Sequence, residues 1–343
     1  MYTQLCTWEN LLLAFRKASR GKRGHPNVAA FEYRLEDNLL QLQRELETQT
    51  YIPGTYHSFY IHEPKRRLIS AAPFRDRVAH HALCNLTEPL FERSFIYDSY
   101  ANRVGKGTHR ALDRAQEFAR RYKYVLQYDI KQFFPSIDHA ILREVLARKV
   151  DDARVLWLID KILASGRGVL SEEYTMVYFP GDDLFAANRP RGLPIGNLTS
   201  QFWANCYLNP FDYFVKRELG CRGYVRYVDD FLLFANDKRA LSQWRAEIMK
   251  RLTALRLTLH ESSAQVKPVT EGIPFLGFYL FPTHRRLKVR KGFAFRRQLM
   301  KLVSALKNGA IVFETLDAVI RGWVNHVRYA DTWGLRRSVL AHV

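Results

Sequence analysis

The chain has 343 residues, enough for two or three packed units with a sizeable core. Its 53 Lys and Arg against 34 Asp and Glu give a formal net charge of +19, which favours a polyanionic partner, nucleic acid before membrane. The four cysteines are widely spaced and form no C-x-x-C pair, so we expect reduced, buried thiols in a cytoplasmic protein, not a zinc site. We expect neither a signal peptide nor a membrane span, since no run of 18 apolar residues occurs.

The N-terminal third predicts helices around a short extended region. Apolar residues at helical spacing indicate helices over residues 8–15 and 31–46. The basic segment 16–27 between them is either a solvated linker or a phosphate contact, with even weight. Residues 51–73 read as extended, and residues 74–92 as a helix. The adjacent His80 and His81 cannot both face one metal on that helix, so we interpret them as structural.

A buried strand is expected over residues 122–130, with Asp129 where the strand gives way to a turn. Pro135 ends the extended structure, and Ser136 is a plausible N-cap for the next helix. Functional groups concentrate at strand ends such as that of Asp129, because a rigid element positions an exposed side chain. Further along the chain, residues 165–191 are rich in loop signals.

The second half predicts a helix, a hairpin and a basic tail. Asn197 is a candidate cap for a helix that Pro210 should kink or break. Two strands rich in aromatic and β-branched residues follow, joined by Val228, Asp229 and Asp230. A helix over 244–259, a strand over 272–282 and a basic helical tail over 285–343 complete the reading.

Three carboxylates at two strand ends carry the chemical signal. Asp229 and Asp230 lie in a turn that lacks the Asn-Gly or Asp-Gly of tight hairpins. An Asp pair in a turn is by itself usually a solvated turn, but two adjacent like charges repel unless a cation compensates. With Asp129 they suit a site for two Mg²⁺ ions, which prefer oxygen ligands and substrate phosphates.

Four motifs in order resemble those of reverse transcriptases of the group II intron and retron kind. They read YDIKQFFPSIDH from Tyr128, LPIGNLTSQ from Leu193, YVDD from Tyr227 and FLGF from Phe275. Where many relatives have QG and SP, this chain has Ile195-Gly196 and Ser200-Gln201, a form similar to the reverse transcriptases of diversity-generating retroelements. The segments TWENLL, FRDRVAHHALCN and FPTHRRL agree with that class.

The resemblance implies an α+β right-hand polymerase with fingers, an antiparallel-sheet palm and a helical thumb. An N-terminal basic helical extension would cover residues 1–30. The fingers would comprise 31–123 and 138–191, the palm 124–137 and 192–281, and the thumb 282–343. We expect no endonuclease, RNase H or further maturase domain in the residues after the last strand.

The resemblance also assigns residues by group. The metal ligands would be Asp129, Ile130, Asp229 and Asp230. Nucleotide contacts would come from Lys65, Arg67, Phe134, Ile195, Gly196 and Gln201, with Phe134 as an aromatic gate under the sugar. Primer and template contacts would come from Phe275, Leu276, Gly277, Phe278, Arg285 and Arg286.

The family's activity would be cDNA synthesis from an RNA template and dNTPs with frequent errors at template adenines, alongside a small helical-bundle accessory protein. One departure concerns the general acid. Some relatives carry Lys after the segment matching LTLH, whereas this chain has Glu261, Ser262 and Ser263, and Lys267 lies later, so the acid stays unassigned.

Three alternatives stay open. The first is a reverse transcriptase of a defence or intron system, although a longer tail or a fused domain would then be expected. The second is a catalytically inactive RNA-binding scaffold, against which the intact carboxylates argue. The third is a two-metal nuclease, which gives no reason for Phe134 or the LPIG block.

Overall fold

The computed structural model describes residues 1–62, 66–260 and 265–341. The chain divides into two compact units, and each is described by itself. Unit 1 comprises Met1–Tyr97, Asp129–Gly220 and Ala246–Glu261, and unit 2 comprises Asp98–Tyr128, Cys221–Arg245 and Ser262–Val343. Strand β3 (Tyr124–Lys131) and helix α11 (Lys238–Ala254) each run from one unit into the other.

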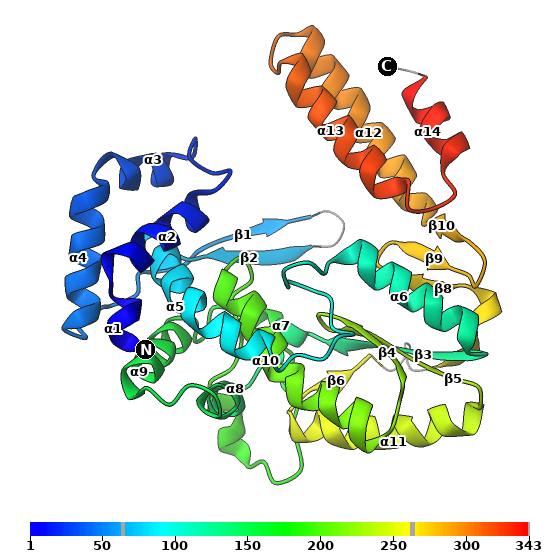
Figure 1. The fold of residues 1–343 in the computed structure, drawn as a ribbon, viewed down its shortest axis with the longest axis horizontal. Coiled ribbons are helices and arrows are strands. Elements are labelled where there is room, and N and C mark those ends of the chain that lie inside the picture. The colour runs from blue at the N-terminus through cyan, green and yellow to red at the C-terminus, as the bar shows by residue number, and fades with distance from the viewer. Residues whose placement is uncertain (63–65, 261–264, 342–343) are drawn as a thin grey trace. The chain divides into compact units, whose positions relative to one another are not determined.

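Unit 1 is mainly helical, and its segments are labelled in Figure 1. Its α-helices are α1 (Tyr2–Leu5), α2 (Trp8–Ser19), α3 (Pro26–Tyr33), α4 (Leu35–Glu47), α5 (Phe74–Glu92), α7 (Phe133–Ser136), α8 (His139–Ala147), α9 (Ala153–Ser165) and α10 (Leu198–Tyr213). Two 3₁₀ turns, η1 (Ser171–Glu173) and η2 (Leu184–Asn188), and the π-helical turn η3 (Phe214–Glu218) complete the helical segments. Its strands are the antiparallel pair β1 (His57–Ile61) and β2 (Arg67–Ala71), and β6 (Thr258–Leu259).

An aromatic trio joins the N-terminal helices of unit 1. The ring of Phe31 lies 5.2 Å from that of Phe74 and 6.0 Å from that of Phe15, measured between centroids. These residues come from α3, α5 and α2, and all three are buried. Aromatic packing of this kind therefore ties the start of the chain to α5, the helix that follows β2.

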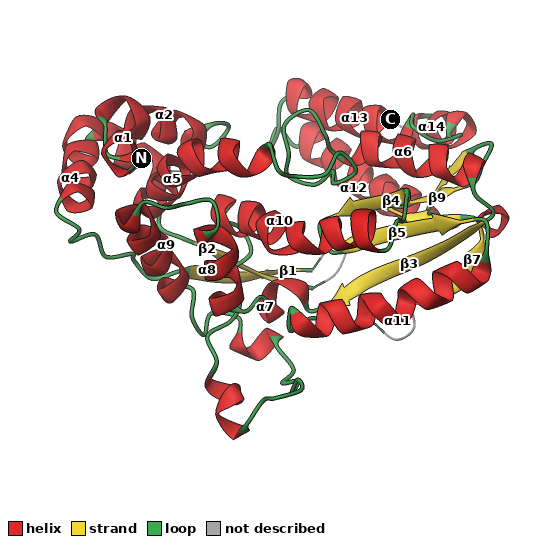
Figure 2. Ribbon diagram, turned by 60° about the horizontal axis from the view of Figure 1, so that its bottom comes forward, coloured by secondary structure: helices red, strands yellow, loops and turns green. Residues whose placement is uncertain are grey.

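Unit 2 holds most of a sheet and a C-terminal set of helices. Its elements are α6 (Thr108–Arg121), β4 (Gly223–Tyr227), β5 (Asp230–Ala235), β7 (Val266–Pro268), the 3₁₀ turn η5 (Val269–Glu271), β8 (Ile273–Phe275), β9 (Phe278–Leu280), β10 (Arg285–Leu287), α12 (Val289–Lys307), α13 (Phe313–Val327) and α14 (Trp333–Leu340). The sheet has the order β4-β5-β3-β6, with β7 also paired to β3, and Figure 2 shows β4, β5 and β3 as neighbouring arrows. Strands β10, β9 and β8 form a separate antiparallel sheet.

Several boundaries correct the sequence-based expectations. The expected helix over 31–46 is two helices, because Arg34 leaves helical geometry with φ −122° and ψ 50°. The basic segment 16–27 is half helical, and its loop is confined to residues 20–25. The expected helix over 244–259 is α11, which ends at Ala254 before the strand β6. The tail beyond 285 begins with strand β10 instead of a helix.

We predicted that Pro210 would kink or break its helix, and the break does not occur. Pro210 lies inside α10, which continues to Tyr213 and passes into the π-helical turn η3. Leu219 N–H donates to the Phe214 carbonyl at 3.0 Å, the five-residue span typical of a π-bulge. The helical segment therefore continues past Pro210 and ends in a wider, π-helical turn.

Most of the residues that we interpreted as structural are buried, although His81 is only half-buried. All four cysteines are buried thiols. His80 is 1% exposed, and burial lowers its pKa to about 3, so the imidazole is neutral in the core of α5. Among the described helices, none has the length and apolar character needed to cross a membrane.

Candidate active site

Asp129 lies near the end of β3, as the sequence predicted. Its side chain is 41% exposed, while the neighbouring Ile130 side chain is 2% exposed. Within unit 1, the Asp129 carbonyl accepts from His260 N–H at 3.1 Å, and β6 pairs with β3 at Ile130 and Lys131. Asp129 is therefore on an anchored strand with its carboxylate accessible, and Ile130 has only its carbonyl to offer as a ligand.

The YVDD segment in unit 2 forms the end of a hairpin whose turn has two residues. Tyr227 pairs with Asp230 across β4 and β5, which leaves Val228 and Asp229 as the turn. Asp230 therefore begins β5 instead of belonging to the connection, which corrects the prediction. Val228 has φ 58°, an unusual value for a β-branched residue, and such outliers cluster at functional sites.

The candidate carboxylates lie at strand ends within each unit. In unit 1, Asp129 lies near the end of β3, and in unit 2, Asp230 begins β5. Within the ranges that the structure describes, no group of three or more His, Cys, Asp or Glu side chains is arranged to hold a metal ion. The donor set itself is chemically suited to Mg²⁺, because every candidate ligand is an oxygen and polymerase metals also take phosphate oxygens.

A segment from Gly192 to Asn197 connects the predicted nucleotide contacts of unit 1. Leu193 N–H donates to the Phe134 carbonyl at 2.9 Å, and Ser70 N–H donates to the Ile195 carbonyl at 2.7 Å. Since Ser70 lies on β2, which begins at Arg67, these bonds bring the region of Phe134, Ile195 and Arg67 together. Gly196 has φ 117°, and a Cβ there would lie 3.0 Å from the Ile69 side chain, so glycine is required at this close approach.

Asn197 has a different task from the one predicted. It occupies the N-cap position of α10 but makes no capping bond. Its amide donates to the carbonyls of Ser70 and Pro194 and accepts from Ala72 N–H, at 2.8, 2.9 and 3.0 Å. The buried amide thus fixes strand β2 to the segment from Gly192 to Asn197. Sequence patterns do not reveal these contacts.

The remaining predicted nucleotide contacts differ in exposure. Phe134 is half-buried, whereas its neighbour Phe133 is 2% exposed and belongs to the core. Gln201 and Arg67 are exposed. Lys65 lies outside the described residues, as do Glu261, Ser262 and Ser263.

The FLGF segment in unit 2 is a tight turn instead of a continuous strand. Phe275 pairs with Phe278, and the turn residues Leu276 and Gly277 have φ values of 48° and 90°. Both phenylalanines are 0% exposed, so any primer contact would come from the turn. Positive φ at both central residues is the geometry that hairpins with matching strand twist use.

The predicted template residues Arg285 and Arg286 have unequal surroundings. Arg285 donates to Asp113 and Gln116 of α6 at 2.7 and 2.8 Å. Its guanidinium is thus engaged within unit 2. Arg286 is exposed, with its guanidinium 5.3 Å from the centre of the Phe281 ring.

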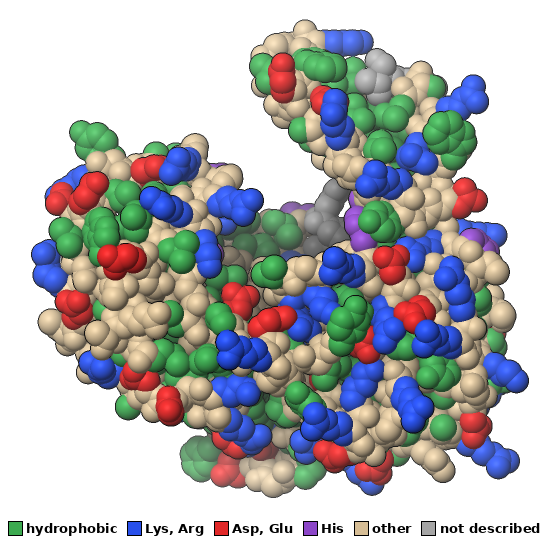
Figure 3. All heavy atoms as spheres, in the orientation of Figure 1, with side chains coloured by type: hydrophobic (Ala, Val, Ile, Leu, Met, Phe, Trp, Pro, Cys, Tyr) green, Lys and Arg blue, Asp and Glu red, His purple; other side chains and the backbone are tan. Residues whose placement is uncertain are grey.

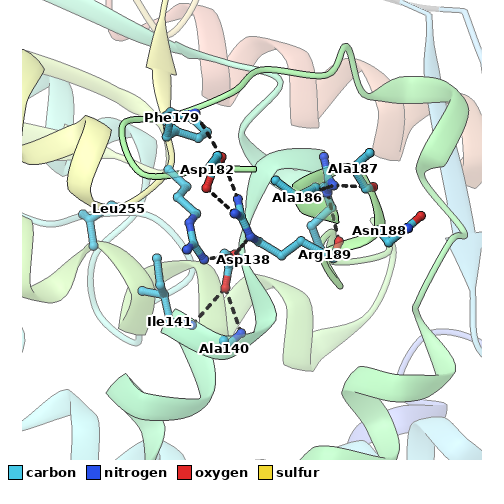
Figure 4. Close-up of polar contacts among 12 residues, drawn as sticks. Asp138, Ala140, Ile141, Phe179, Asp182, Ala186, Ala187, Asn188, Arg189 and Leu255 are labelled. Carbon is cyan, nitrogen blue, oxygen red and sulfur yellow. Dashed lines mark hydrogen bonds and ion pairs between the residues drawn. The ribbon is translucent and has the colours of Figure 1, made fainter. Parts of the chain in front are cut away.

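Sequence reasoning missed a buried carboxylate that organises unit 1. Asp138, and not Ser136, caps α8, since it accepts from the N–H groups of Ala140 and Ile141 at 2.9 and 3.1 Å (Figure 4). Its other oxygen accepts from Arg256 at 2.6 Å and lies 3.6 Å from Nε of Arg189. The capping signature, Asp before an apolar helical run, was present in the sequence and could have identified the cap but not the arginines.

This carboxylate links three segments around the predicted nucleotide region. Arg189 also pairs with Asp182, and this contact lowers the pKa of the Asp182 carboxyl (Figure 4). The contacts hold the loop before Gly192 and the residues before β6 against the start of α8. Next to them, the buried His139 ring lies 2.8 Å from the Gly192 carbonyl, and burial lowers the pKa of His139.

Comparison with known proteins agrees with the motifs. The model of the family "Reverse transcriptase (RNA-dependent DNA polymerase)" matches residues 61–280. The chain belongs to the reverse transcriptase family. Its enzyme class is therefore RNA-directed DNA polymerase, and its fold is the α+β polymerase fold of that family.

Individual relatives show how far the likeness extends. Protein YkfC of Escherichia coli (strain K12) is 25% identical over 76% of this chain and 75% of its own length. The group II intron-encoded protein LtrA of Lactococcus lactis subsp. cremoris is 26% identical over 52% of this chain, but the match spans only 28% of LtrA. A structure of apo telomerase from Candida tropicalis is similar over 68% of this chain and 48% of its own, with a TM-score of 0.45 and 11% identity.

Proposed function

We propose that this reverse transcriptase belongs to a diversity-generating retroelement and copies a template RNA into cDNA with frequent errors at template adenines. The observation that carries the proposal is the apolar Ile195 at a position where many relatives have Gln, on a segment bonded to β2. Its partners would be template RNA, the growing cDNA, dNTPs and a small helical-bundle accessory protein. Its setting would be the cytoplasm of a bacterium, with the gene on the chromosome or a phage.

Asp129, Asp229 and Asp230, with the Ile130 carbonyl, would hold two Mg²⁺ ions in this proposal. When bound, such ions activate the primer 3′-hydroxyl and neutralise the charge of the leaving pyrophosphate. The protein's part is to present the carboxylates at fixed positions. The two-residue YVDD turn and the β6-anchored end of β3 support that role.

The nucleotide would be oriented by groups of unit 1. Arg67, exposed at the start of β2, would contact the triphosphate. The family resemblance implies the same contact for Lys65. The half-buried Phe134 ring would exclude a ribose 2′-hydroxyl. Gly196 has no Cβ and adopts a positive φ, so its backbone lies close to β2. The same lack of a side chain would let the backbone approach the nucleotide.

Ile195 provides a physical reason for low fidelity. Its side chain has no hydrogen-bonding capacity, whereas glutamine can both donate and accept. Losing one such contact costs about 0.5–1.5 kcal/mol. Because about 1.4 kcal/mol is a factor of ten, the loss allows up to about tenfold less discrimination between a correct pair and a mismatch.

Sequencing of cDNA made on one defined RNA template tests the proposal. We expect wild-type protein to make cDNA whose errors concentrate opposite adenine, and Ile195→Gln to make fewer such errors. Leu193→Met, a change in the same segment that adds no amide, is the matched control and should leave the error spectrum unchanged.

The same experiment separates the competing readings. A uniform, low error rate with robust synthesis would favour a reverse transcriptase of intron or defence type, the reading that the likeness to LtrA supports. RNA binding without synthesis would favour a scaffold. An unchanged error spectrum in active Ile195→Gln would remove the argument from Ile195.

A further inference from the structure

A fully buried arginine lies next to the YVDD turn in unit 2. Arg226 is 0% exposed, although it carries a permanent charge. Its guanidinium Nη1 donates to the Val228 carbonyl at 2.9 Å. Burial of a charged group is costly unless hydrogen bonds satisfy it, so an arginine at this place needs a reason beyond packing.

The backbone of Arg226 is also held by hydrogen bonds. Arg226 N–H donates to the Asp98 carbonyl at 2.9 Å, and the Arg226 carbonyl accepts from Tyr100 N–H at 3.0 Å. Ser99 forms a parallel bridge with Arg226 between these bonds. The segment from Asp98 to Tyr100 thus fixes the end of β4 from which the turn departs.

The turn itself has a conformation that its sequence does not favour. Val228 has φ 58°, where hairpins normally use glycine, asparagine or aspartate. A β-branched residue in this region is held there by its surroundings and not by its own preference. In unit 2, Arg226 donates to the Val228 carbonyl, and the hydroxyls of Tyr227 and Thr108 lie 3.1 Å apart, so both contacts help to hold the turn.

We propose that Arg226 is a positioning residue, which holds Val228 in the left-handed conformation and thereby fixes the direction in which Asp229 and Asp230 present their carboxylates. This inference rests on the proposed role of those aspartates as metal ligands. Arg226 acts through the Val228 carbonyl and touches neither metal nor substrate. Loss of its hydrogen bond lets the turn relax, so metal affinity falls even where the fold survives.

The first test measures Mn²⁺ binding by electron paramagnetic resonance, alongside the Mg²⁺ concentration that gives half-maximal primer extension. Arg226→Met, which fills the space without a donor, should weaken Mn²⁺ binding about tenfold or more, since hydrogen bonds to charged groups are strong. Arg226→Lys keeps a charge and a donor and should have an intermediate effect. Added metal should restore part of the lost extension rate in both variants.

A double-mutant cycle with Val228→Gly tests the mechanism. Glycine adopts positive φ at little cost, so the turn no longer depends on an external hold. In the Val228→Gly background, Arg226→Met should weaken Mn²⁺ binding less than about threefold, a clear departure from additivity. If Arg226→Met does not fold, the same cycle is made with Arg226→Lys.

Arg114→Met is the matched control for loss of stability. Arg114 lies on α6, outside the β4–β5 hairpin, and donates to Asp98 at 2.8 Å in the same unit. It should lower the melting temperature without weakening Mn²⁺ binding. Equal weakening in Arg114→Met and Arg226→Met at equal loss of stability, or an additive cycle, would overturn the proposal.

The outcomes also separate this inference from the proposed function. Weaker metal binding in Arg226→Met together with a wild type that makes no cDNA would retain the positioning role and reject the polymerase role. Normal synthesis by wild type with unchanged metal binding and metal dependence in Arg226→Met would reject the positioning role alone.

Discussion

Adjacent residues of one type have different surroundings in this chain, and burial separates them. Phe133 is 2% exposed and packs in the core, with its ring 5.4 Å from that of the half-buried Phe134. The family motif implies that Phe134 is the gate, and the alternative is that Phe134 is a core residue beside Phe133. The structure makes Phe133 the core member, which leaves Phe134 available for the sugar contact that the family motif implies.

Truncation of Phe134 is therefore expected to change the choice of sugar. Phe134→Ala removes the ring and leaves space beside the segment from Gly192 to Asn197, so a ribose 2′-hydroxyl is no longer excluded. Incorporation of ribonucleotides relative to deoxynucleotides should rise by about tenfold or more in single-nucleotide extension assays, since tenfold corresponds to about 1.4 kcal/mol.

The control for Phe134→Ala is Phe185→Ala, which removes a 78% exposed ring from the turn η2 of the same unit. It should leave the ratio of ribonucleotide to deoxynucleotide unchanged. A folded, active Phe134→Ala protein with the wild-type ratio would show that the sugar is selected elsewhere.

At the scale of elements, the buried carboxylate of Asp138 in unit 1 joins the start of α8 to Arg256 and Arg189 from two other segments. Asp138→Asn keeps a good capping residue for α8 but removes the charge that faces Arg256 and Arg189. The Arg256 side chain is 32% exposed, so solvent reduces the value of the pair, and we expect the free energy of unfolding to fall by about 1–3 kcal/mol. Chemical denaturation monitored by circular dichroism measures the change.

Asp152→Asn is the comparison variant. Asp152 caps α9 with the same two backbone bonds and pairs with the Met1 amine at 3.3 Å, but it is 17% exposed, against 2% for Asp138. It should cost less stability than Asp138→Asn, and equal losses would mean that the buried arginine contacts of Asp138 add no more than the more exposed ion pair of Asp152.

The comparison of elements shows which features a sequence can predict. The helix at 74–92 and the strand at 223–227 were predicted with their observed bounds, because local periodicity and punctuation define them. Asn197 occupies the predicted N-cap position but makes tertiary contacts instead of a capping bond, and the break predicted as one outcome at Pro210 does not occur, since α10 passes into the π-helical turn η3. The arginines on Asp138 and Val228 were missed, because no local pattern records contacts made across the fold.

The candidate site was predicted unevenly for the same reason. Motifs singled out Asp129, Phe134, Ile195 and the YVDD turn as candidates. Asp129 and the YVDD turn lie at strand ends, Ile195 lies on a bonded loop segment, and Phe134 lies in the short helix α7. They did not predict that Phe275 and Phe278 would be buried or that Arg285 would bind α6. Burial and pairing of such residues depend on the three-dimensional packing of distant segments.

At the scale of the whole molecule, the net charge of +19 is the dominant property. Lys and Arg side chains are spread widely over the face drawn in Figure 3, with acidic side chains between them. Several basic residues of α12, namely Arg290, Arg296 and Arg297, are exposed. We expect these to contact phosphate, because neutralisation of phosphates releases bound counterions.

Replacement of these three arginines by glutamine should make RNA binding less sensitive to salt. Each phosphate contact on a single strand contributes a slope of about −0.7, so the slope of log affinity against log salt should become shallower by about 2. Fluorescence anisotropy on a labelled RNA across a salt series measures it. The control replaces Arg143, Arg148 and Arg321, which are each paired with a carboxylate, and should change the slope less.

We expect this chain to synthesise DNA on RNA through the carboxylates of Asp129, Asp229 and Asp230. Asp129→Asn and Asp229→Asn keep side-chain shape but remove a charge, and each should reduce Mg²⁺-dependent primer extension on an RNA template by about a thousandfold or more. RNA binding should persist in both, and Asp237→Asn, an exposed aspartate after β5, should retain wild-type extension. Near-normal extension by Asp129→Asn or Asp229→Asn would contradict the account.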